Sequence, residues 1–147
     1  MMKKQAVVID NRVGRLEFME DVISRVDPHT QCISFVFGDE AIDMINHEMV
    51  DAPSHIFIDT NLKRTSISKC LKTLRSNSRL DSCCITVLSD TMPTAVADAY
   101  CNMGADFAFT TPLTMSNGVE MLQCVLPAVR SKSAHARVDH LTAESPS

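Results

Sequence analysis

The sequence predicts a three-layer α/β fold, in which a five-stranded parallel sheet is wound with helices on both faces. Three observations support this prediction. Short β-prone apolar runs alternate five times with segments whose apolar residues recur at helical spacing. Each apolar run closes at a polar or turn-forming residue. Strand–helix units in series give a parallel sheet, because every crossover must be right-handed and must cover one face.

The expected strands are short, and their closing residues carry the chemistry discussed below. They cover residues 6–9, 32–37, 55–58, 84–88 and 107–109. The first closes on Asp10, the third on Asp59 and the fourth on Ser89. For five such units the usual arrangement is the flavodoxin-like strand order 2-1-3-4-5.

Apolar residues at helical spacing predict five helices between and after these strands. The residues that mark them are Leu16, Met19, Ile23 and Val26; then Ala41, Ile42, Ile45 and Met49; then Ile67, Cys70, Leu71 and Leu74; then Ala95, Val96, Ala99 and Met103; and finally Val119, Leu122, Val125, Leu126 and Val129. Asp27-Pro28 should end the first helix. Gly104 is placed to cap the fourth helix in a left-handed conformation, and Pro127 should kink or shorten the last.

Length and composition bound the class of protein. The 147 residues allow one domain, expected over residues 1–130, followed by a polar tail over 131–147 that we expect to be disordered or a linker. A net charge of -4 argues against a nucleic-acid-binding surface. No apolar run approaches the ~20 residues of a membrane span. The six cysteines show no CxxC spacing, which favours reduced thiols, mostly in the core, and a cytoplasmic location.

Two carboxylates are expected at the place where this fold binds ligands. In open parallel sheets, that place lies outside the carboxyl ends of the strands where the order reverses, here between the first and third strands. Those strands close on Asp10 and Asp59. Close carboxylates repel unless a cation lies between them, and oxygen ligands of this kind suit Mg²⁺. A carboxylate beside Mg²⁺ can act as a nucleophile toward phosphorus, with the Ser89 hydroxyl donating to a phosphoryl oxygen. The plainer interpretation is that each Asp caps its own loop.

Five segments in series resemble the receiver domain of two-component response regulators, over about residues 5 to 130. They are Val7-Val8-Ile9-Asp10-Asn11, Ile56-Phe57-Ile58-Asp59-Thr60-Asn61-Leu62, Ile85-Thr86-Val87-Leu88-Ser89, Met103-Gly104-Ala105-Asp106 and Thr111-Pro112-Leu113. The resemblance implies that Asp59 accepts a phosphoryl group from a histidine kinase or a phosphotransfer protein. It implies a Mg²⁺ ion held by Asp10, Asp59 and the backbone carbonyl of Asn61, with Ser89 on the phosphoryl group.

The chain also departs from the family pattern, so we interpret it as a degenerate member. Asn11 replaces the second acid of the first strand and should bind metal only weakly. Thr111 stands where the family has a lysine before proline, and Ala108 aligns with the aromatic residue of the fifth strand. Positive charge could come from Arg12, Lys63 or Arg64, although each alone is expected to be a solvated loop charge.

Three functions follow from these features. The first is phosphorylation at Asp59, read out by protein–protein contacts and not by enzymatic activity. The second is a pseudo-receiver that docks to partners without phosphorylation. The third, which the glycine-poor loop after the first strand disfavours, is a flavodoxin-like FMN or nucleotide binder. Output to a downstream protein target, or a weak homodimer, is expected at the fourth helix, fifth strand and fifth helix. Residues expected near that face are Tyr100, Met103, Ala108, Met115 and Met121.

Overall fold

The computed structural model describes residues 4–128 and 130, and its fold is the predicted one. Five parallel strands form one sheet in the order β2-β1-β3-β4-β5. The strands are β1 (Gln5–Ile9), β2 (Gln31–Phe35), β3 (His55–Asp59), β4 (Cys84–Ser89) and β5 (Phe107–Thr110). The helices are α1 (Val13–Val26), α2 (Gly38–Asn46), α3 (Ile67–Arg75), α4 (Thr94–Asn102) and α5 (Met115–Val125), with a short 3₁₀ turn at Ser78–Leu80.

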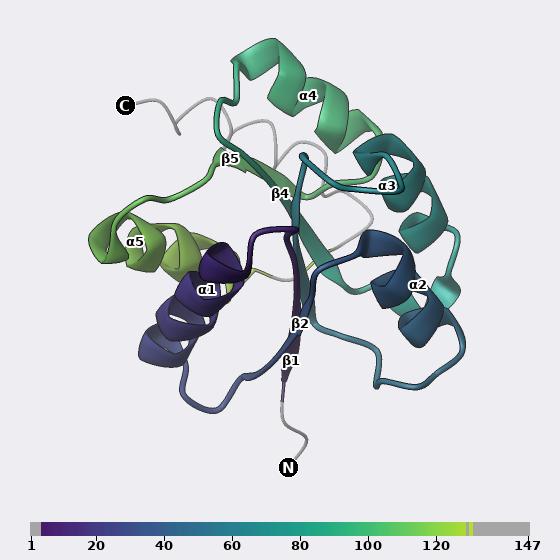
Figure 1. The fold of residues 1–147 in the computed structure, drawn as a ribbon, viewed down its shortest axis with the longest axis horizontal. Coiled ribbons are helices and arrows are strands. Elements are labelled where there is room, and N and C mark those ends of the chain that lie inside the picture. The colour runs from purple at the N-terminus through teal and green to yellow at the C-terminus, as the bar shows by residue number, and fades with distance from the viewer. Residues whose placement is uncertain (1–3, 129, 131–147) are drawn as a thin grey trace.

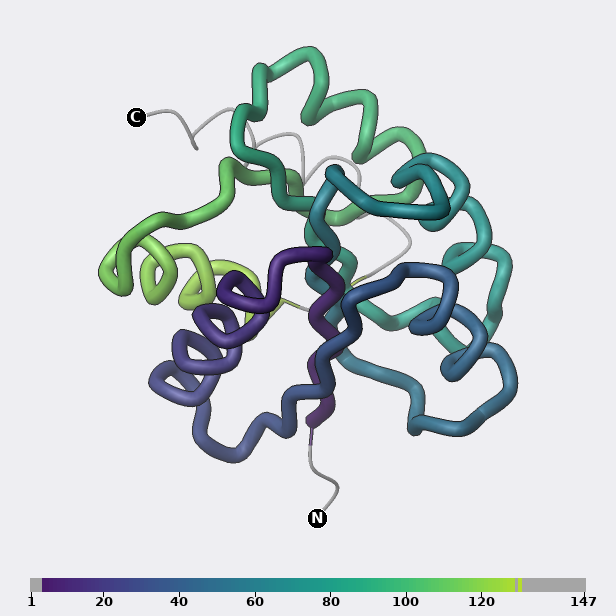
Figure 2. Tube along the Cα trace, viewed as in Figure 1, coloured from purple at the N-terminus to yellow at the C-terminus, as the bar shows by residue number. Residues whose placement is uncertain are grey.

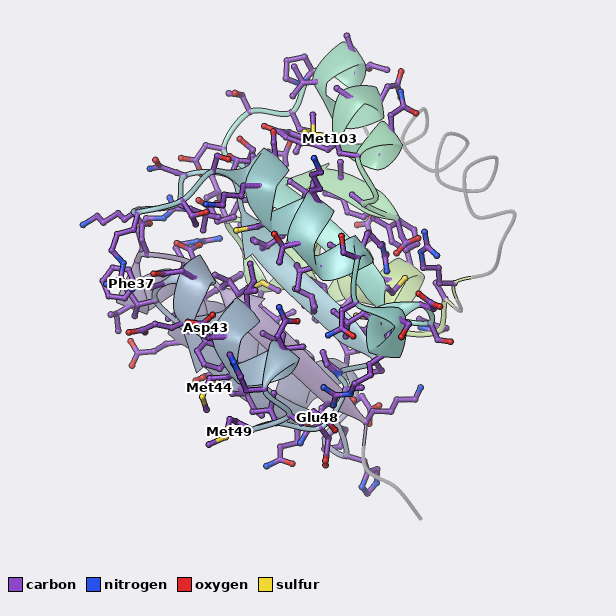
Figure 3. The ribbon with its side chains drawn as sticks, turned by 90° about the vertical axis from the view of Figure 1, so that its right-hand side faces the viewer. Phe37, Asp43, Met44, Glu48, Met49 and Met103 are labelled. Atoms are coloured by element: carbon purple, nitrogen blue, oxygen red, sulfur yellow. The ribbon has the colours of Figure 1, made fainter. Side chains whose placement is uncertain are left out.

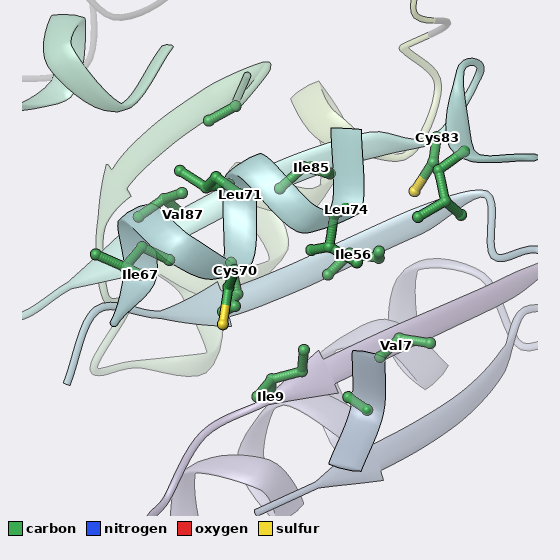
Figure 4. Packing of buried hydrophobic residues seen from close by; sticks show 14 of the residues in the cluster. Val7, Ile9, Ile56, Ile67, Cys70, Leu71, Leu74, Cys83, Ile85 and Val87 are labelled. Carbon is green, nitrogen blue, oxygen red and sulfur yellow. The ribbon is translucent and has the colours of Figure 1, made fainter. Parts of the chain in front are cut away.

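The helices form two layers around the sheet. Figure 1 shows α1 and α5 together on one face, and α2, α3 and α4 on the other. Alternate residues of each strand point into the two layers, which is why residues 6–9 of β1 are all apolar and buried. Val7 and Ile9 join the core beneath α2 and α3, whereas Ala6 and Val8 join the core beneath α1 and α5. Figure 4 shows Val7 and Ile9 in the first of these cores.

Four of the six cysteines lie in the core, as predicted from the sequence. Cys70, Cys83, Cys84 and Cys101 are buried, Cys32 is half-buried and Cys124 is exposed. Burial raises the pKa of the Cys83 thiol to about 12, so this side chain stays a neutral, apolar group at physiological pH. No helix in the described part of the chain is long and apolar enough to cross a membrane.

Two helix predictions need correction. The fourth helix exists, but it buries Ala97 and Cys101, whereas Val96 and Met103 are exposed. Ala95 and Ala99 are exposed as well, so all four predicted markers lie on the solvent side. Met49 lies beyond the end of α2 and is 67% exposed, at the surface labelled in Figure 3. The short helix α4 has alanine or another apolar residue on several faces, so spacing alone cannot select the buried one.

The ends of several elements also differ from the predictions. The second strand ends at Phe35, two residues earlier than predicted, because α2 begins at Gly38. The last helix ends at Val125, before Pro127, as predicted. Gly104 follows α4 with a φ of 120°, which confirms the predicted cap. Val129 and the predicted tail over 131–147 lie outside the described residues.

Candidate functional site

Asp10 and Asp59 lie next to each other at the carboxyl edge of the sheet, as the strand order requires. Asp59 is the last residue of β3, and Asp10 directly follows β1, the strand beside it. Both are almost fully buried, at 6% and 3% exposure. Ser89, half-buried, ends β4 on the other side of β3. Figure 2 shows the loops that follow β1 and β3 leaving the sheet at this same edge.

The guanidinium group of Arg12 lies between the two carboxylates. Its Nε donates to Asp10 Oδ1 at 3.1 Å, and its Nη2 donates to Asp59 Oδ1 at 3.1 Å and to Asp10 Oδ2 at 3.3 Å. Nη1 lies 3.4 Å from a carboxylate oxygen of the exposed Asp90, in the loop after β4. One side chain thus joins the ends of three neighbouring strands through charge-assisted hydrogen bonds.

The backbone of Arg12 is held on both sides. Its N–H donates to Asp10 Oδ1 at 2.9 Å, which closes a turn typical of aspartate. Its carbonyl accepts from the N–H groups of Arg15 and Leu16, because Arg12 is the N-cap residue of α1. The start of α1 and the end of β1 together fix the point from which the guanidinium group extends.

Opposing effects act on the pKa of Asp59. Burial raises the pKa of this carboxyl above its ordinary value, and the charge of Asp10 adds to that effect. The Asn61 N–H, which donates to Asp59 Oδ2 at 2.8 Å, and the charge of Arg12 lower the pKa and offset part of the rise. The hydrogen bond to Asp10 raises the pKa of Arg12, so the guanidinium stays charged. Arg12 is therefore a permanent cation beside the Asp59 carboxyl group, whose charged form is disfavoured by burial.

The other predicted site residues are placed as follows. The Asn11 side-chain oxygen is buried and has no hydrogen-bond partner. Asn61 is exposed, and its backbone N–H fixes Asp59. Thr111 is buried; its N–H donates to the Ser89 carbonyl at 2.8 Å, while its hydroxyl oxygen has no hydrogen-bond partner. Ala108 is buried at 1% exposure. The fifth strand therefore has no aromatic side chain at the position where the family pattern has one.

Of the three loop cations considered from the sequence, only Arg12 reaches the carboxylates. Arg64 instead pairs with Asp39 at 2.9 Å and lies 3.7 Å over the Phe37 ring, on the α2 surface. Lys63 is exposed. The interpretation of Arg12 as a solvated loop charge was wrong. An arginine two residues after a strand-ending aspartate can fold back over it, and this spacing was the signal available in the sequence. Nothing in the sequence indicated that Asp90, which follows Ser89, contacts Arg12.

A divalent cation does not fit the carboxylates as they are arranged. All four oxygens of Asp10 and Asp59 already accept hydrogen bonds: three from Arg12 and the fourth from the Asn61 N–H. Within residues 4–128 and 130, no group of three or more His, Cys, Asp or Glu side chains gathers to hold a metal ion. The free oxygen of Asn11 is one neutral ligand, whereas Mg²⁺ requires near-octahedral oxygen coordination. A metal ion would first have to displace the guanidinium group.

Comparisons with known proteins identify the fold. Neither a scan against protein-family models nor a search of curated proteins finds a match. Among solved structures, the chain is similar to the chemotaxis response regulator CheY4 of Vibrio cholerae, with a TM-score of 0.72 and 15% identity over 84% of this chain and 99% of the other. It is also similar to the phosphorylated cyanobacterial phytochrome response regulator RcpA, with a TM-score of 0.76 and 14% identity over 88% and 100%.

A third similar structure is the Mn²⁺-bound form of response regulator Rcp1, with a TM-score of 0.70 and 16% identity over 87% of this chain and 99% of the other. At these identities the likeness concerns the fold. In strand order, layer arrangement and length, the described chain has the fold of response-regulator receiver domains.

Proposed function

We propose that this chain is a signalling receiver domain in which Asp59 accepts a phosphoryl group. The observation that carries the proposal is the buried Asp59 carboxylate at the carboxyl end of β3, beside Asp10 and between the strands that end at Asp10 and Ser89. This is the edge at which open parallel sheets bind ligands. The sequence resemblance implies the same position for the phosphorylated aspartate.

The proposed donor is the phosphohistidine of a histidine kinase or phosphotransfer protein. A carboxylate oxygen of Asp59 forms the new bond to phosphorus as the phosphorus–nitrogen bond breaks. The bonding electrons leave with the donor imidazole, which takes up a proton. Arg12, which already contacts Asp59, is placed to donate to the phosphoryl oxygens, and such a charge-assisted contact is worth about 1.5–3 kcal/mol. Ser89 would contact the same oxygens.

The resemblance also implies Mg²⁺, held by Asp10, Asp59, the Asn61 carbonyl and weakly by Asn11. One similar structure is described as Mn²⁺-bound. In this chain the ion would compete with Arg12 for the carboxylate oxygens, so the proposal assigns no step to it.

We propose that output leaves through the surface of α4, β5 and α5, by contact with a downstream protein or by a weak homodimer. Support comes from apolar side chains that are exposed on or beside these elements: Val96 at 39%, Met103 at 40% and Leu113 at 76%. Such a domain acts by binding and not as an enzyme, and we expect it in the cytoplasm.

The second candidate function, docking without phosphorylation, is favoured by the bridge that Arg12 forms. Asp59 is covered, and part of its charge is already balanced, before any phosphoryl donor arrives. The chain would then present one fixed surface to its partners. The FMN-binding alternative gains no support, since the loop after β1 places Arg12 where a phosphate-cradling loop would be needed.

Intact mass after incubation with acetyl phosphate separates the first two functions. Receiver activity predicts a mass gain of one phosphoryl group in the wild type and in Ser116→Ala, an exposed hydroxyl control on α5. The gain should vanish in Asp59→Asn. If the wild type shows no gain and its two-dimensional NMR spectrum is unchanged by the donor, the phosphorylation proposal fails and the docking function takes its place.

A further inference from the structure

The cation that balances Asp10 and Asp59 is part of the polypeptide. We propose that the Arg12 guanidinium permanently occupies the cation position of this site and makes it independent of divalent metal ions. The inference concerns the charge balance of the carboxylates, so it holds whether or not Asp59 is phosphorylated.

The contact pattern of Arg12 differs from that of an ordinary surface ion pair. Exposed pairs contribute little, because water solvates both partners. Here both carboxylates are nearly buried, with side-chain exposures of 9% for Asp10 and 3% for Asp59. Arg12 supplies three hydrogen-bond donors to Asp10, including its own N–H, and one to Asp59. The planar fork of guanidinium donors matches paired carboxylate oxygens in a way that a solvated ion does not.

The backbone hydrogen bonds of Arg12 keep its guanidinium group at the site. The N–H of Arg12 is bound to Asp10, and its carbonyl is bound to the first turn of α1. The guanidinium therefore starts from a fixed point beside its carboxylates, and little conformational freedom remains to be lost on binding. A free divalent ion has to be recruited from solution and partly dehydrated before it can bind.

The net charge of the site also favours Arg12 over a divalent ion. Asp10 and Asp59 together carry two negative charges, which a divalent ion would balance. Arg12 neutralises one of them, and Asn11 adds an amide oxygen where an acid would have added a third negative charge. Both residues lower the attraction for a divalent cation. Any metal ion that bound here would lie beside a guanidinium that remains charged.

Removal of the Arg12 side chain should therefore create a metal site. In Arg12→Ala, the four carboxylate oxygens lose all of their side-chain donors but keep the N–H groups of residues 12 and 61. Asn11 directly follows Asp10, and its Oδ1 is buried without a hydrogen-bond partner, so we expect it to serve as an additional oxygen ligand. Two carboxylates and an amide oxygen form a set of hard ligands suited to Mn²⁺ or Mg²⁺.

Electron paramagnetic resonance of Mn²⁺ tests the proposal, because the sharp signal of the free ion falls when the ion binds. The wild type should leave the signal unchanged at concentrations at which Arg12→Ala reduces it, with a gain in affinity of about tenfold or more. The gain should be lost in Arg12→Ala/Asp59→Asn, which places the ion at Asp59. Arg25→Ala removes an equal charge from the exposed last turn of α1 and should behave as the wild type.

Two results would overturn the proposal. One is Mn²⁺ binding by the wild type that is as tight as that of Arg12→Ala and is abolished by Asp59→Asn. The other is a folded Arg12→Ala that binds no more Mn²⁺ than the wild type. If circular dichroism shows that Arg12→Ala does not fold, Arg12→Met keeps an apolar stem of similar reach without the charge, and the same criterion then applies to it. A failure of acetyl phosphate to label Asp59 leaves these outcomes unchanged, which separates this proposal from the proposed function.

Discussion

Arginine–aspartate clusters lie at both edges of the sheet, and they have different roles. At the carboxyl edge, the edge at which open parallel sheets bind ligands, Arg12 joins Asp10 and Asp59. At the amino edge, Asp106 precedes β5 and is 1% exposed. It accepts from Arg75 at 2.6 Å, from Arg130 at 2.9 Å and from the N–H of Ile85 at 2.9 Å. Arg75 also donates to three backbone carbonyls, so this second cluster fastens loops to one another and is structural.

Replacement of Asp106 by asparagine should therefore destabilise the fold without affecting the candidate site. The variant leaves two guanidinium groups beside each other without the buried carboxylate, and loss of one partner of a buried pair costs about 3 kcal/mol or more. Urea denaturation measures this loss. Asp98→Asn, an exposed change on α4, is the control and should stay within about 0.5 kcal/mol of the wild type. A loss below about 1 kcal/mol for Asp106→Asn would show that the cluster behaves as a surface pair.

At the scale of elements, α1 and α5 pack together closely because Gly118 faces Val22. A Cβ atom at Gly118 would lie 2.9 Å and 3.0 Å from the two methyl carbons of the buried Val22. Val22 is β-branched and has little freedom to move aside. The two helices can therefore approach only with glycine at this position. Since Arg12 is the N-cap residue of α1, this contact also supports the helix that positions the guanidinium group.

Gly118→Ala and Gly14→Ala form a matched pair of variants. Both gain the helix propensity of alanine, which amounts to about 1 kcal/mol at most. A Cβ at Gly14 meets nothing within 4 Å, whereas one at Gly118 meets Val22. The free energy of unfolding should thus be lower for Gly118→Ala than for Gly14→Ala by about 1–3 kcal/mol, the typical cost of overpacking. Equal stabilities, measured by urea denaturation, would mean that α1 and α5 adjust without cost.

At the scale of the whole molecule, His55 connects the sheet to the helical layer over its face. This residue begins β3 and is 3% exposed. Its Nε2 lies 3.2 Å from the Val125 carbonyl at the end of α5, and its Nδ1 lies 2.9 Å from the Ser54 hydroxyl. Burial lowers the pKa of His55 below its ordinary value of 6.5, while Val125 and the charge of Asp106 oppose that effect and the charge of Lys4 adds to it. The folded state therefore holds this imidazole neutral.

Stability should accordingly fall as the pH is lowered through 6.5. Below that value the unfolded chain binds a proton at His55 that the folded chain binds less readily, so acid favours unfolding. Above pH 6.5, the contribution of His55 to the free energy of unfolding does not change with pH. The slope approaches about 1.4 kcal/mol per pH unit at most. Urea denaturation between about pH 7.5 and about pH 5.5 should show a flatter dependence for His55→Gln than for the wild type. The exposed His29→Gln should keep the wild-type dependence, and equal slopes for all three would refute the assignment.

The sequence was sufficient to predict the fold, because the information lies in features repeated along the chain. Alternation of strand and helix patterns, with right-handed crossovers, predicted the order β2-β1-β3-β4-β5 that the structure has. Strand ends predicted that Asp10 and Asp59 would be neighbours. The buried face of α4 could not be predicted, since Ala95, Val96, Ala97, Ala99 and Cys101 offer apolar groups in several directions. Packing against the neighbouring elements selects Ala97 and Cys101.

The role of Arg12 could not be predicted for a related reason. Its charge alone is typical of any solvated loop, and only the backbone at the start of α1 directs the side chain over two buried carboxylates. The sequence therefore predicted the acids of the site and a metal ion between them, whereas the structure has a guanidinium group there.

The most direct test of this account observes the Arg12 guanidinium group itself. In ¹⁵N NMR spectra, the Nε–H resonance of Arg12 should stay in place when millimolar Mg²⁺ is added at constant ionic strength. It should move in Asp10→Ala, because Nε donates to Asp10 Oδ1. Such a result means that the guanidinium stays on its carboxylates while metal ions are present. If Mg²⁺ instead shifts the wild-type resonance to the position of a solvated arginine, the ion displaces Arg12, and the claim of a resident cation is contradicted.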